Sequence, residues 1–448
     1  MQTTRLNRFC FLGALWLAMP PRRDLPAQSP PIRTLLPTSV TSTQSFGGVL
    51  NIRVLSDGRV LVNDGVRRRV LLLDERLSNP RVVLDSIAGD GVGAYGPAAA
   101  PLIAFPGDST LFVDGIAGAL VVIGPDGRLS GAIAPPNRDA LRFLAGSRAL
   151  SDRRGNLYFR LAAPNRPTRS IDSASGDVIL TSELPDSVAI VRADLASRSI
   201  DTIGRIRQES GTRSQLSRAP SGRTSLTVTI QPMSTRDEWT VLSGGSVALV
   251  RGHDYHIDWI RSGAQLQSTP RMPFEWKRMT DADKQQLVDS LRARFDSVRS
   301  AASARGGAAA GEIALLAVLR TLVSTVPGAP SATSGVAKEQ PTSAPTDGEL
   351  KITFVNAREI PDYIPPFRQG SVLADEENNL WILPTVTANR GSGELVYDVV
   401  NAEGVLFERV RVPSGRSIAG FGPRGAVYLM YRHTGGEWFI ERTAVVGR

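Results

Sequence analysis

The stretch VLSDGRVLVNDGVRRRVLLLDE, residues 54–75, contains three apolar runs separated by an Asp-Gly pair and by a polar turn. Short apolar runs rich in β-branched residues are typical of strands. A glycine in a two-residue loop supplies the positive φ that tight hairpins need. The stretch therefore predicts three consecutive antiparallel strands. Whether it is a lone hairpin or one copy of a repeat decides the architecture.

The same pattern recurs along the chain. Further copies occupy residues 102–129, 148–162 continued by 187–206, 237–266, 371–412 and 417–446. Most copies continue into a fourth strand, and an isolated four-stranded antiparallel sheet cannot bury both of its faces. Repetition of such units is typical of sheets stacked around a common axis. We therefore expect an all-β chain, a six-bladed β-propeller of four-stranded antiparallel blades spanning residues 28–448.

A resemblance supports this expectation. The stretches at residues 56–64, 151–160 and 375–383 are similar to the repeat phrase of NHL-repeat and TolB-like six-bladed β-propellers. From about residue 45 to 448 the chain also resembles exported bacterial six-bladed propellers of unassigned role, in PDSVAIVRADL (185–195), HDYHIDWI (253–260) and EENNLWI (376–382). The resemblance implies the fold and says almost nothing about chemistry, because propellers carry unrelated functions.

The first 27 residues have the features of a secretory signal. Arg5 and Arg8 precede an apolar run at 9–19, and a small-residue site ends at Ala27. The alternative is a membrane anchor, but the run is shorter than the roughly 20 residues that span a bilayer. We expect cleavage after Ala27, a periplasmic or extracellular location and no transmembrane segment in the mature chain. The single cysteine, Cys10, lies in this signal, so the mature chain would have no disulfide and no thiolate ligand.

The net charge of +9 and the isoelectric point near 10.1 are compatible with an anionic partner. However, the arginines are scattered, and their densest run, residues 67–69, falls in a predicted turn. No predicted helix carries a basic stripe, and no aromatic-basic module stands out. We therefore expect no nucleic-acid partner.

Residues 270–349 interrupt the repeat between the fourth and fifth copies. Residues 280–300 place Leu287, Val288, Leu291, Phe295 and Val298 on one helical stripe, and Thr280 with Asp283 forms a variant of the capping box. Residues 311–326 are apolar on nearly all sides, which indicates a buried helix. Residues 327–349 are rich in Pro, Ser, Ala and Thr and are typical of a linker. The insertion is either a lid without further role or an arm that binds a partner.

Catalytic motifs are missing from the sequence. The histidines are His253, His256 and His433, and alternation along a strand would put the first two on opposite faces, which does not suit a zinc site. We find no nucleophile elbow, no P-loop and no dinucleotide fingerprint. We therefore assign no catalytic residue.

A calcium site on the propeller axis is the remaining candidate, because the chain also resembles gluconolactonase-type propellers, which hold calcium there. The second strands of the six copies end in Asn63 and Asp64, Asp114, Arg160, Arg251, Leu383 and Pro384, and Met430 and Tyr431. Calcium needs six to eight oxygen ligands with several carboxylates. This set suits calcium poorly, so we expect no metal and no cofactor. Asp64, Asp114, Arg160 and Arg251 instead form a candidate site for a zwitterionic or peptide-like ligand, or else a solvated rim.

Strand order predicts which face binds. In a four-stranded blade, the connections between strands 1 and 2 and between strands 3 and 4 lie on one face, here called the short-turn face. The remaining connections lie on the opposite, long-loop face, and they include the segments at 86–101, 163–185, 208–224 and 270–349. Long loops on a rigid scaffold commonly carry binding residues, although insertions also accumulate wherever folding tolerates them.

We therefore expect a binding or scaffold module that takes an unknown protein, peptide or small molecule on the long-loop face. The alternative is a calcium-dependent propeller hydrolase or lactonase. Charge reversal at Arg160 and Arg251 together is expected to weaken binding and to change stability by no more than about 1 kcal/mol, as at exposed positions. The last copy has three strands, and residues 32–42 are expected to supply its fourth, because a three-stranded blade would leave an open edge.

Overall fold

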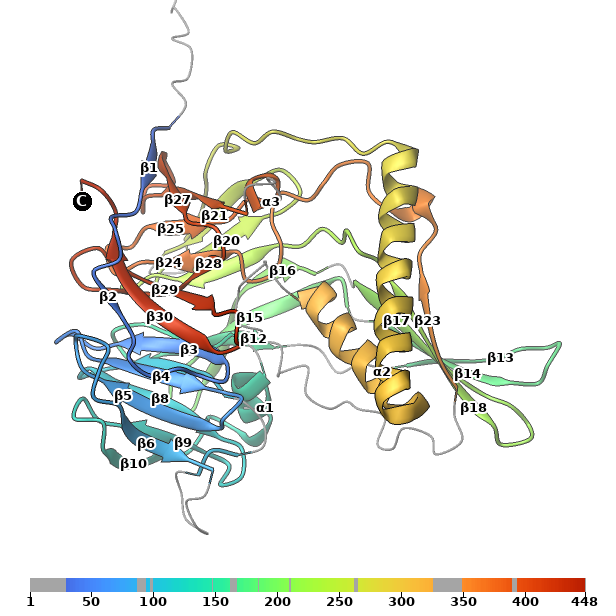
Figure 1. The fold of residues 1–448 in the computed structure, drawn as a ribbon, viewed down its shortest axis with the longest axis horizontal. Helices are drawn as coiled ribbons and strands as arrows, with labels where there is room; N and C mark the ends of the chain where they lie inside the picture. The colour runs from blue at the N-terminus through green and yellow to red at the C-terminus, as the bar shows by residue number, and fades with distance from the viewer. Residues whose placement is uncertain are drawn as a thin grey trace, which may run out of the picture.

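The computed structural model describes residues 30–86, 94–96, 100–146, 148–161, 167–183, 185–208, 211–261, 265–324, 349–388 and 393–447. The expected signal at 1–27 and nearly all of the expected linker at 327–349 lie outside the described residues. Strands dominate the fold and helices are few (Figure 1). In the described part of the chain, no helix is both long enough and apolar enough to cross a membrane.

The first three repeats each form a four-stranded antiparallel sheet, called sheets 1 to 3 in chain order. Sheet 1 contains β3 (Val49–Val54), β4 (Val60–Asp64), β5 (Arg69–Leu73) and β6 (Arg81–Asp85). Sheet 2 contains β7 (Leu102–Phe105), β8 (Ser109–Asp114), β9 (Ala119–Ile123) and β10 (Leu129–Ile133). Sheet 3 contains β11 (Leu150–Ser151), β12 (Leu157–Leu161), β15 (Ser187–Ala193) and β16 (Ile200–Arg207). Because β15 pairs with β12, the prediction that residues after 185 supply the third strand of an interrupted copy is confirmed.

Sheets 4 to 6 follow the same order. Sheet 4 contains β19 (Glu238–Val241), β20 (Val247–Arg251), β21 (His256–Ile260) and β22 (Leu266–Ser268). Sheet 5 contains β24 (Val372–Ala374), β25 (Leu380–Ile382), β26 (Leu395–Val400) and β27 (Leu406–Val412). Sheet 6 contains β28 (Arg416–Gly422), β29 (Ala426–Arg432) and β30 (Trp438–Ala444).

The N-terminal segment completes the last two sheets. The strand β2 (Val40–Thr41) pairs antiparallel with β30, and Leu35 bridges to Val445, so the predicted closing strand is confirmed. The preceding strand β1 (Ile32–Thr34) was not foreseen. It pairs in parallel with β27 and becomes a fifth strand of sheet 5.

Hydrophobic clusters join each sheet to the next. One cluster runs through sheets 1, 2 and 3, and four others link sheets 3 and 4, 4 and 5, 5 and 6, and 6 and 1. The first strands also contact one another in order, with β28 beside β3, β3 beside β7, β7 beside β11, β11 beside β19 and β19 beside β24. The sheets therefore follow one another around a common centre, as in a β-propeller-type fold, with the first strands innermost.

A further five-stranded sheet stands beside these six (Figure 1). It has the order β13 (Thr168–Ile171), β14 (Val178–Glu183), β17 (Thr212–Arg218), β18 (Thr224–Ile230) and β23 (Glu349–Phe354). The helix α2 (Asp281–Ser324) packs against it through Phe295, which forms a hydrophobic cluster with Ile230, Ile352 and Phe354. We call this sheet with α2 the arm. The segments at 163–185 and 208–224, which we expected to be loops, thus contribute strands to the arm.

The helical part of the arm was largely predicted. The Thr280 backbone N–H donates to Asp283 Oδ2 at 2.8 Å and the Asp283 N–H donates to Thr280 Oγ1 at 3.1 Å, so the capping box is confirmed. Val288 and Phe295 of the expected stripe are buried. The two expected helical runs form one helix, and its start is fixed by Lys284, whose buried ammonium donates to Asp362 Oδ1 at 2.6 Å.

Candidate functional site

The two predicted aspartates are buried and hold turns on the long-loop face. Asp64 is 0% exposed, and Oδ1 accepts hydrogen bonds from the backbone N–H groups of Gly47 and Gly48 at 3.1 Å and of Arg67 at 3.3 Å. Asp114, at the equivalent place in sheet 2, is 1% exposed, and Oδ1 accepts from Ile116 and from the residue after it, both at 2.9 Å. Both carboxylates therefore fix backbone at the point where a second strand ends.

The two predicted arginines converge on one strand start. Arg160, at the end of β12, forms an ion pair with Glu238 at 3.1 Å. Arg251, at the end of β20, pairs with Asp237 and with Asp258, each at 2.7 Å. Asp237 immediately precedes β19 and Glu238 opens it, so both arginines form ion pairs at the start of the same strand. Asp64 and Asp114 belong to other sheets and are not part of these ion pairs.

The expected stability change for Arg160 and Arg251 needs correction. Their side chains are only 14% and 23% exposed, and their acidic partners are buried. Reversing both charges would set acid against buried acid, so the expectation of a change within about 1 kcal/mol, made for exposed positions, is wrong.

Arg148 was missed by sequence reasoning and lies close to the centre of the fold. It precedes β11 of sheet 3, and Nη1 donates to the carbonyl oxygens of Trp239 in sheet 4, at 3.3 Å, and of Val372 in sheet 5. The pKa of Arg148 is lowered to about 10, mainly by burial; the charge of Glu238 acts in the opposite direction, and the charge of Arg160 acts in the same direction as burial. The guanidinium stays charged at neutral pH and ties three sheets together. The only signal in the sequence was an isolated arginine just before a short first strand.

Arg236 and Arg368 extend this group. Arg236 is buried, and Nη1 donates to Gln369 Oε1 at 2.6 Å while Nη2 donates to Ser234 Oγ at 3.2 Å. Arg368 precedes β24, and burial lowers the pKa of its guanidinium. Among the described residues, no hydrogen bond or ion pair reaches the Arg368 side chain.

We call these residues the arginine cluster: Arg148, Arg160, Arg236, Arg251 and Arg368, with Asp237 and Glu238. They occupy the starts of first strands and the ends of second strands, which all lie on the long-loop face. Even with Asp258, which also pairs with Arg251, five arginines face three acids. Arg368 is a partly buried cation without a described counter-ion, and such a cation favours an anionic ligand group. The arrangement suits recognition of a carboxylate or of a zwitterion.

The residues present do not fit calcium. The carboxylates of Asp64 and Asp114 already accept hydrogen bonds from backbone N–H groups. The equivalent positions in sheets 3 and 4 are arginines. Calcium requires several free carboxylate oxygens. Within the described ranges, no three His, Cys, Asp or Glu side chains come together as a metal site.

His256 belongs to a hydrogen-bonded chain at the edge of the cluster. Its Nδ1 lies 2.6 Å from Asp254 Oδ1, and its Nε2 lies 3.2 Å from Asp258 Oδ1. Burial alone would raise the pKa of Asp258, but hydrogen bonds from Ser268 and Arg251 and the charges of Arg251 and His256 hold it below its ordinary value. Both imidazole nitrogens face carboxylates, so His256 has no nitrogen left to activate a nucleophile.

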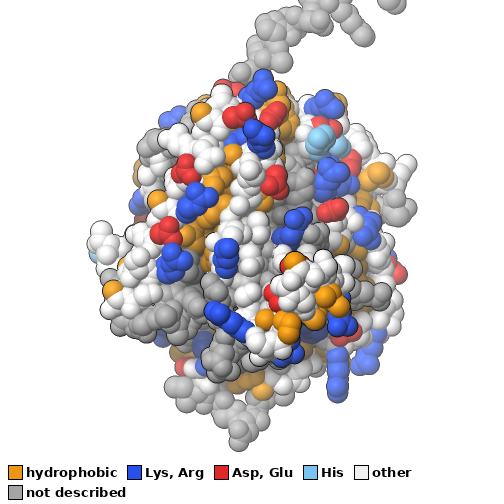
Figure 2. Space-filling model, turned by 90° about the vertical axis from the view of Figure 1, so that its right-hand side faces the viewer, with side chains coloured by type: hydrophobic (Ala, Val, Ile, Leu, Met, Phe, Trp, Pro, Cys, Tyr) orange, Lys and Arg blue, Asp and Glu red, His pale blue; other side chains and the backbone are white. Residues whose placement is uncertain are grey.

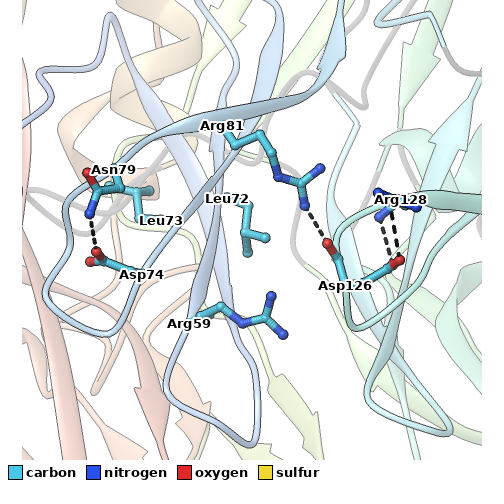
Figure 3. Close-up of a pocket in the computed structure, with 8 residues that line it drawn as sticks. All are labelled: Arg59, Leu72, Leu73, Asp74, Asn79, Arg81, Asp126 and Arg128. Atoms are coloured by element: carbon cyan, nitrogen blue, oxygen red, sulfur yellow. Dashed lines mark hydrogen bonds and ion pairs between the residues drawn. The ribbon is translucent and has the colours of Figure 1, made fainter.

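A hollow of the described surface lies on the opposite face. A groove of about 570 Å³ runs between sheets 1 and 2 at their short turns and is lined by Arg59, Leu72, Leu73, Asp74, Asn79, Arg81, Asp126 and Arg128. Figure 3 shows Arg81 and Arg128 directed toward Asp126, and Asn79 toward Asp74. Arg59 Nε donates to Asp57 Oδ2 at 2.7 Å and Nη2 donates to Pro125 O at 2.8 Å. Because these polar side chains already pair with residues of the turns, the groove has fewer charged groups without a partner than the arginine cluster.

No family model matches the chain, and no curated protein matches it by sequence. Among solved structures, it is similar to a member of the DUF4221 family from Bacteroides vulgatus, with 9% identity, a TM-score of 0.39 and coverage of 92% of this chain and 98% of that chain. It is also similar to an exported protein from Bacteroides fragilis (10% identity, TM-score 0.39, coverage 92% and 94%). A third structure is the calcium-binding protein regucalcin from Agrobacterium tumefaciens (10% identity, TM-score 0.32, coverage 93% and 97%). Similarities this weak do not identify a family or an activity, and the description of the fold rests on its own strand order.

Proposed function

We propose that this protein is an exported six-bladed β-propeller of the NHL-repeat and TolB-like type that binds a ligand or protein partner on its long-loop face. One observation carries the proposal: insertions from three separate places in the chain leave on this face and unite in a single arm. Insertions that were merely tolerated would have no reason to assemble with one another. Binding residues on a rigid scaffold are commonly presented by such segments.

The arginine cluster is the proposed ligand site. Asp64 and Asp114 would support the mouth by holding its turns, and Arg160 and Arg251 would contact the ligand from the rim. A carboxylate-bearing or zwitterionic ligand fits best, because Arg368 has no described counter-ion and Asp237 and Glu238 could accept from an ammonium group. The proposal requires no metal, no cofactor and no catalytic step.

Arg368→Gln tests the site with little risk to folding, because no described partner depends on the Arg368 guanidinium. The matched control is Arg128→Gln on the short-turn face, where the Arg128 side chain is 83% exposed. Immobilised mature protein would be exposed to the native envelope fraction, and bound proteins and small molecules would be quantified by mass spectrometry. Arg368→Gln should lose a component that wild type and Arg128→Gln retain. Equal retention by all three proteins would contradict the proposed site.

Export is tested separately by the mass of the chain recovered from periplasm or medium. We expect a chain that begins at Gln28. Recovery of an intact N-terminus from the membrane fraction would contradict export with cleavage.

A further inference from the structure

The sheet of the arm has one apolar and one polar face. Strand register places Leu180 opposite Leu216, Leu216 opposite Leu226, and Leu226 opposite Leu350. Directly paired residues project from the same face of a sheet, so four neighbouring strands each contribute one leucine to a single row. The residues between them along the strands are mostly polar, among them Thr181, Gln215, Thr227 and Lys351.

Among the described residues, the apolar face is covered at the end that packs against α2. Ile230 and Phe354, two rows further along the same face, contact Phe295 of α2, and Ile230 is 1% exposed. The four leucines of the row are only partly buried. Ile171, one row beyond them on β13, is 63% exposed. Burial thus decreases steadily from α2 toward the hairpin ends of the arm.

Exposed arginines border the leucine row on the same face. Arg169 pairs with Leu180 and so extends the row onto β13, and Arg218 pairs with Val178 in the next row. Both side chains are exposed, and among the described residues neither has a hydrogen bond or ion pair. Figure 2, which views the molecule from the side of the arm, shows hydrophobic side chains gathered at the surface with Lys and Arg beside them.

We propose that this face of the arm docks an amphipathic segment of another protein, apolar on one side and acidic along its margin. The leucines supply the apolar contact, and Arg169 and Arg218 select for acidic residues. A second copy of this chain is a poorer occupant, because it would bring arginines against arginines. The row spans three strand spacings, about 14 Å, which a helix of about ten residues would cover. The inference rests on the proposed long-loop-face function and identifies its partner class.

Two synthetic helical peptides test the charge preference. They share the same leucines on one side and carry either Glu or Lys on the other, and their binding to the full mature chain is followed by fluorescence anisotropy. The Glu peptide should bind at least tenfold more tightly than the Lys peptide. Leu216→Ser with Leu226→Ser should weaken that binding at least tenfold, whereas Thr181→Ser with Thr227→Ser on the polar face should leave it unchanged.

Charge reversal gives a result that misfolding cannot imitate. Arg169→Glu with Arg218→Glu should switch the preference to the Lys peptide. Equal binding of both peptides, or an unchanged preference after reversal, would overturn the proposal. So would binding of phosphatidylglycerol vesicles in place of peptide, or self-association that the leucine substitutions abolish. Arg368→Gln should leave peptide binding intact, so failure here is distinguishable from failure of the arginine-cluster proposal.

Discussion

Removal of residues 28–44 should destabilise the protein strongly, because this segment fastens the last two sheets. Beyond the ladders of β1 and β2, six backbone hydrogen bonds join it to the rest: Leu36 to Ala444, Ser39 to Arg442, Ser42 to Ile440, Thr43 to Leu77, Arg409 to Pro31 and Val446 to Thr34. At a net value of about 1 kcal/mol for each bond, the free energy of unfolding should fall by about 6 kcal/mol.

A loss of that size is comparable with the whole stability of many domains. At about 2 °C for each kcal/mol in a large domain, Tm should fall by about 12 °C. Thermal unfolding followed by far-ultraviolet circular dichroism would measure the change. Removal of residues 28–30 alone is the control, because it spares every contact named above. A fall of less than about 2 °C would mean that the N-terminal segment does not close the ring, and would refute the reasoning.

Three further predictions concern the candidate site. Asp64→Ala should lower the free energy of unfolding, measured in urea, by about 3 kcal/mol, because it leaves partly buried backbone N–H groups unpaired. The exposed substitution Asp126→Ala should lower it by less than about 1 kcal/mol, and equal losses would contradict the structural role of Asp64. The double substitution Arg160→Glu with Arg251→Glu should lower the free energy of unfolding by at least about 3 kcal/mol. An unchanged free energy of unfolding would mean that the ion pairs do not form. The pKa of Asp258 is lowered in the folded state, so its carboxylate stabilises the fold fully above its ordinary pKa, and this contribution is lost as pH falls through the folded-state value. Asp258→Asn should therefore make the free energy of unfolding depend less on pH below about pH 4. An unchanged pH dependence in this range would refute the prediction.

Local turn chemistry made the six repeats predictable. Gly58, Gly155 and Gly245 close equivalent turns between first and second strands, with φ of 89°, 87° and 86°. Asn378 takes the same place in sheet 5 with φ of 65°. These turns need positive φ, so Gly and Asn between apolar runs are visible in a single sequence.

The arm was not predictable, because its sheet is assembled across long distances in the chain. The strands β18 and β23 pair in parallel although the long helix α2 lies between them in the sequence. The strand β17, TRSQLSR, has one leucine and no apolar alternation, so nothing local marks it as a strand. A signal did exist at β14, where VILTSE is rich in β-branched residues after a Gly-Asp turn.

The candidate site was predictable in position but not in its partners. Strand order placed Arg160 and Arg251 at second-strand ends on one face, and the structure agrees. Their pairing with Glu238 and Asp237 depends on the packing of sheet 3 against sheet 4, which a single sequence does not reveal. Arg148 was missed for the same reason, since its acceptors lie in two other sheets.

The central claim, that partners bind on the long-loop face, is tested most directly by site-specific photo-crosslinking in the native cell. A photoreactive residue would replace Val66 or Ile116, which are 71% and 67% exposed in long-loop-face turns, or Asp57 or Asp126 on the short-turn face. The account predicts a defined crosslinked product from the long-loop positions and none from the short-turn positions. A product formed only from Asp57 or Asp126 would contradict it.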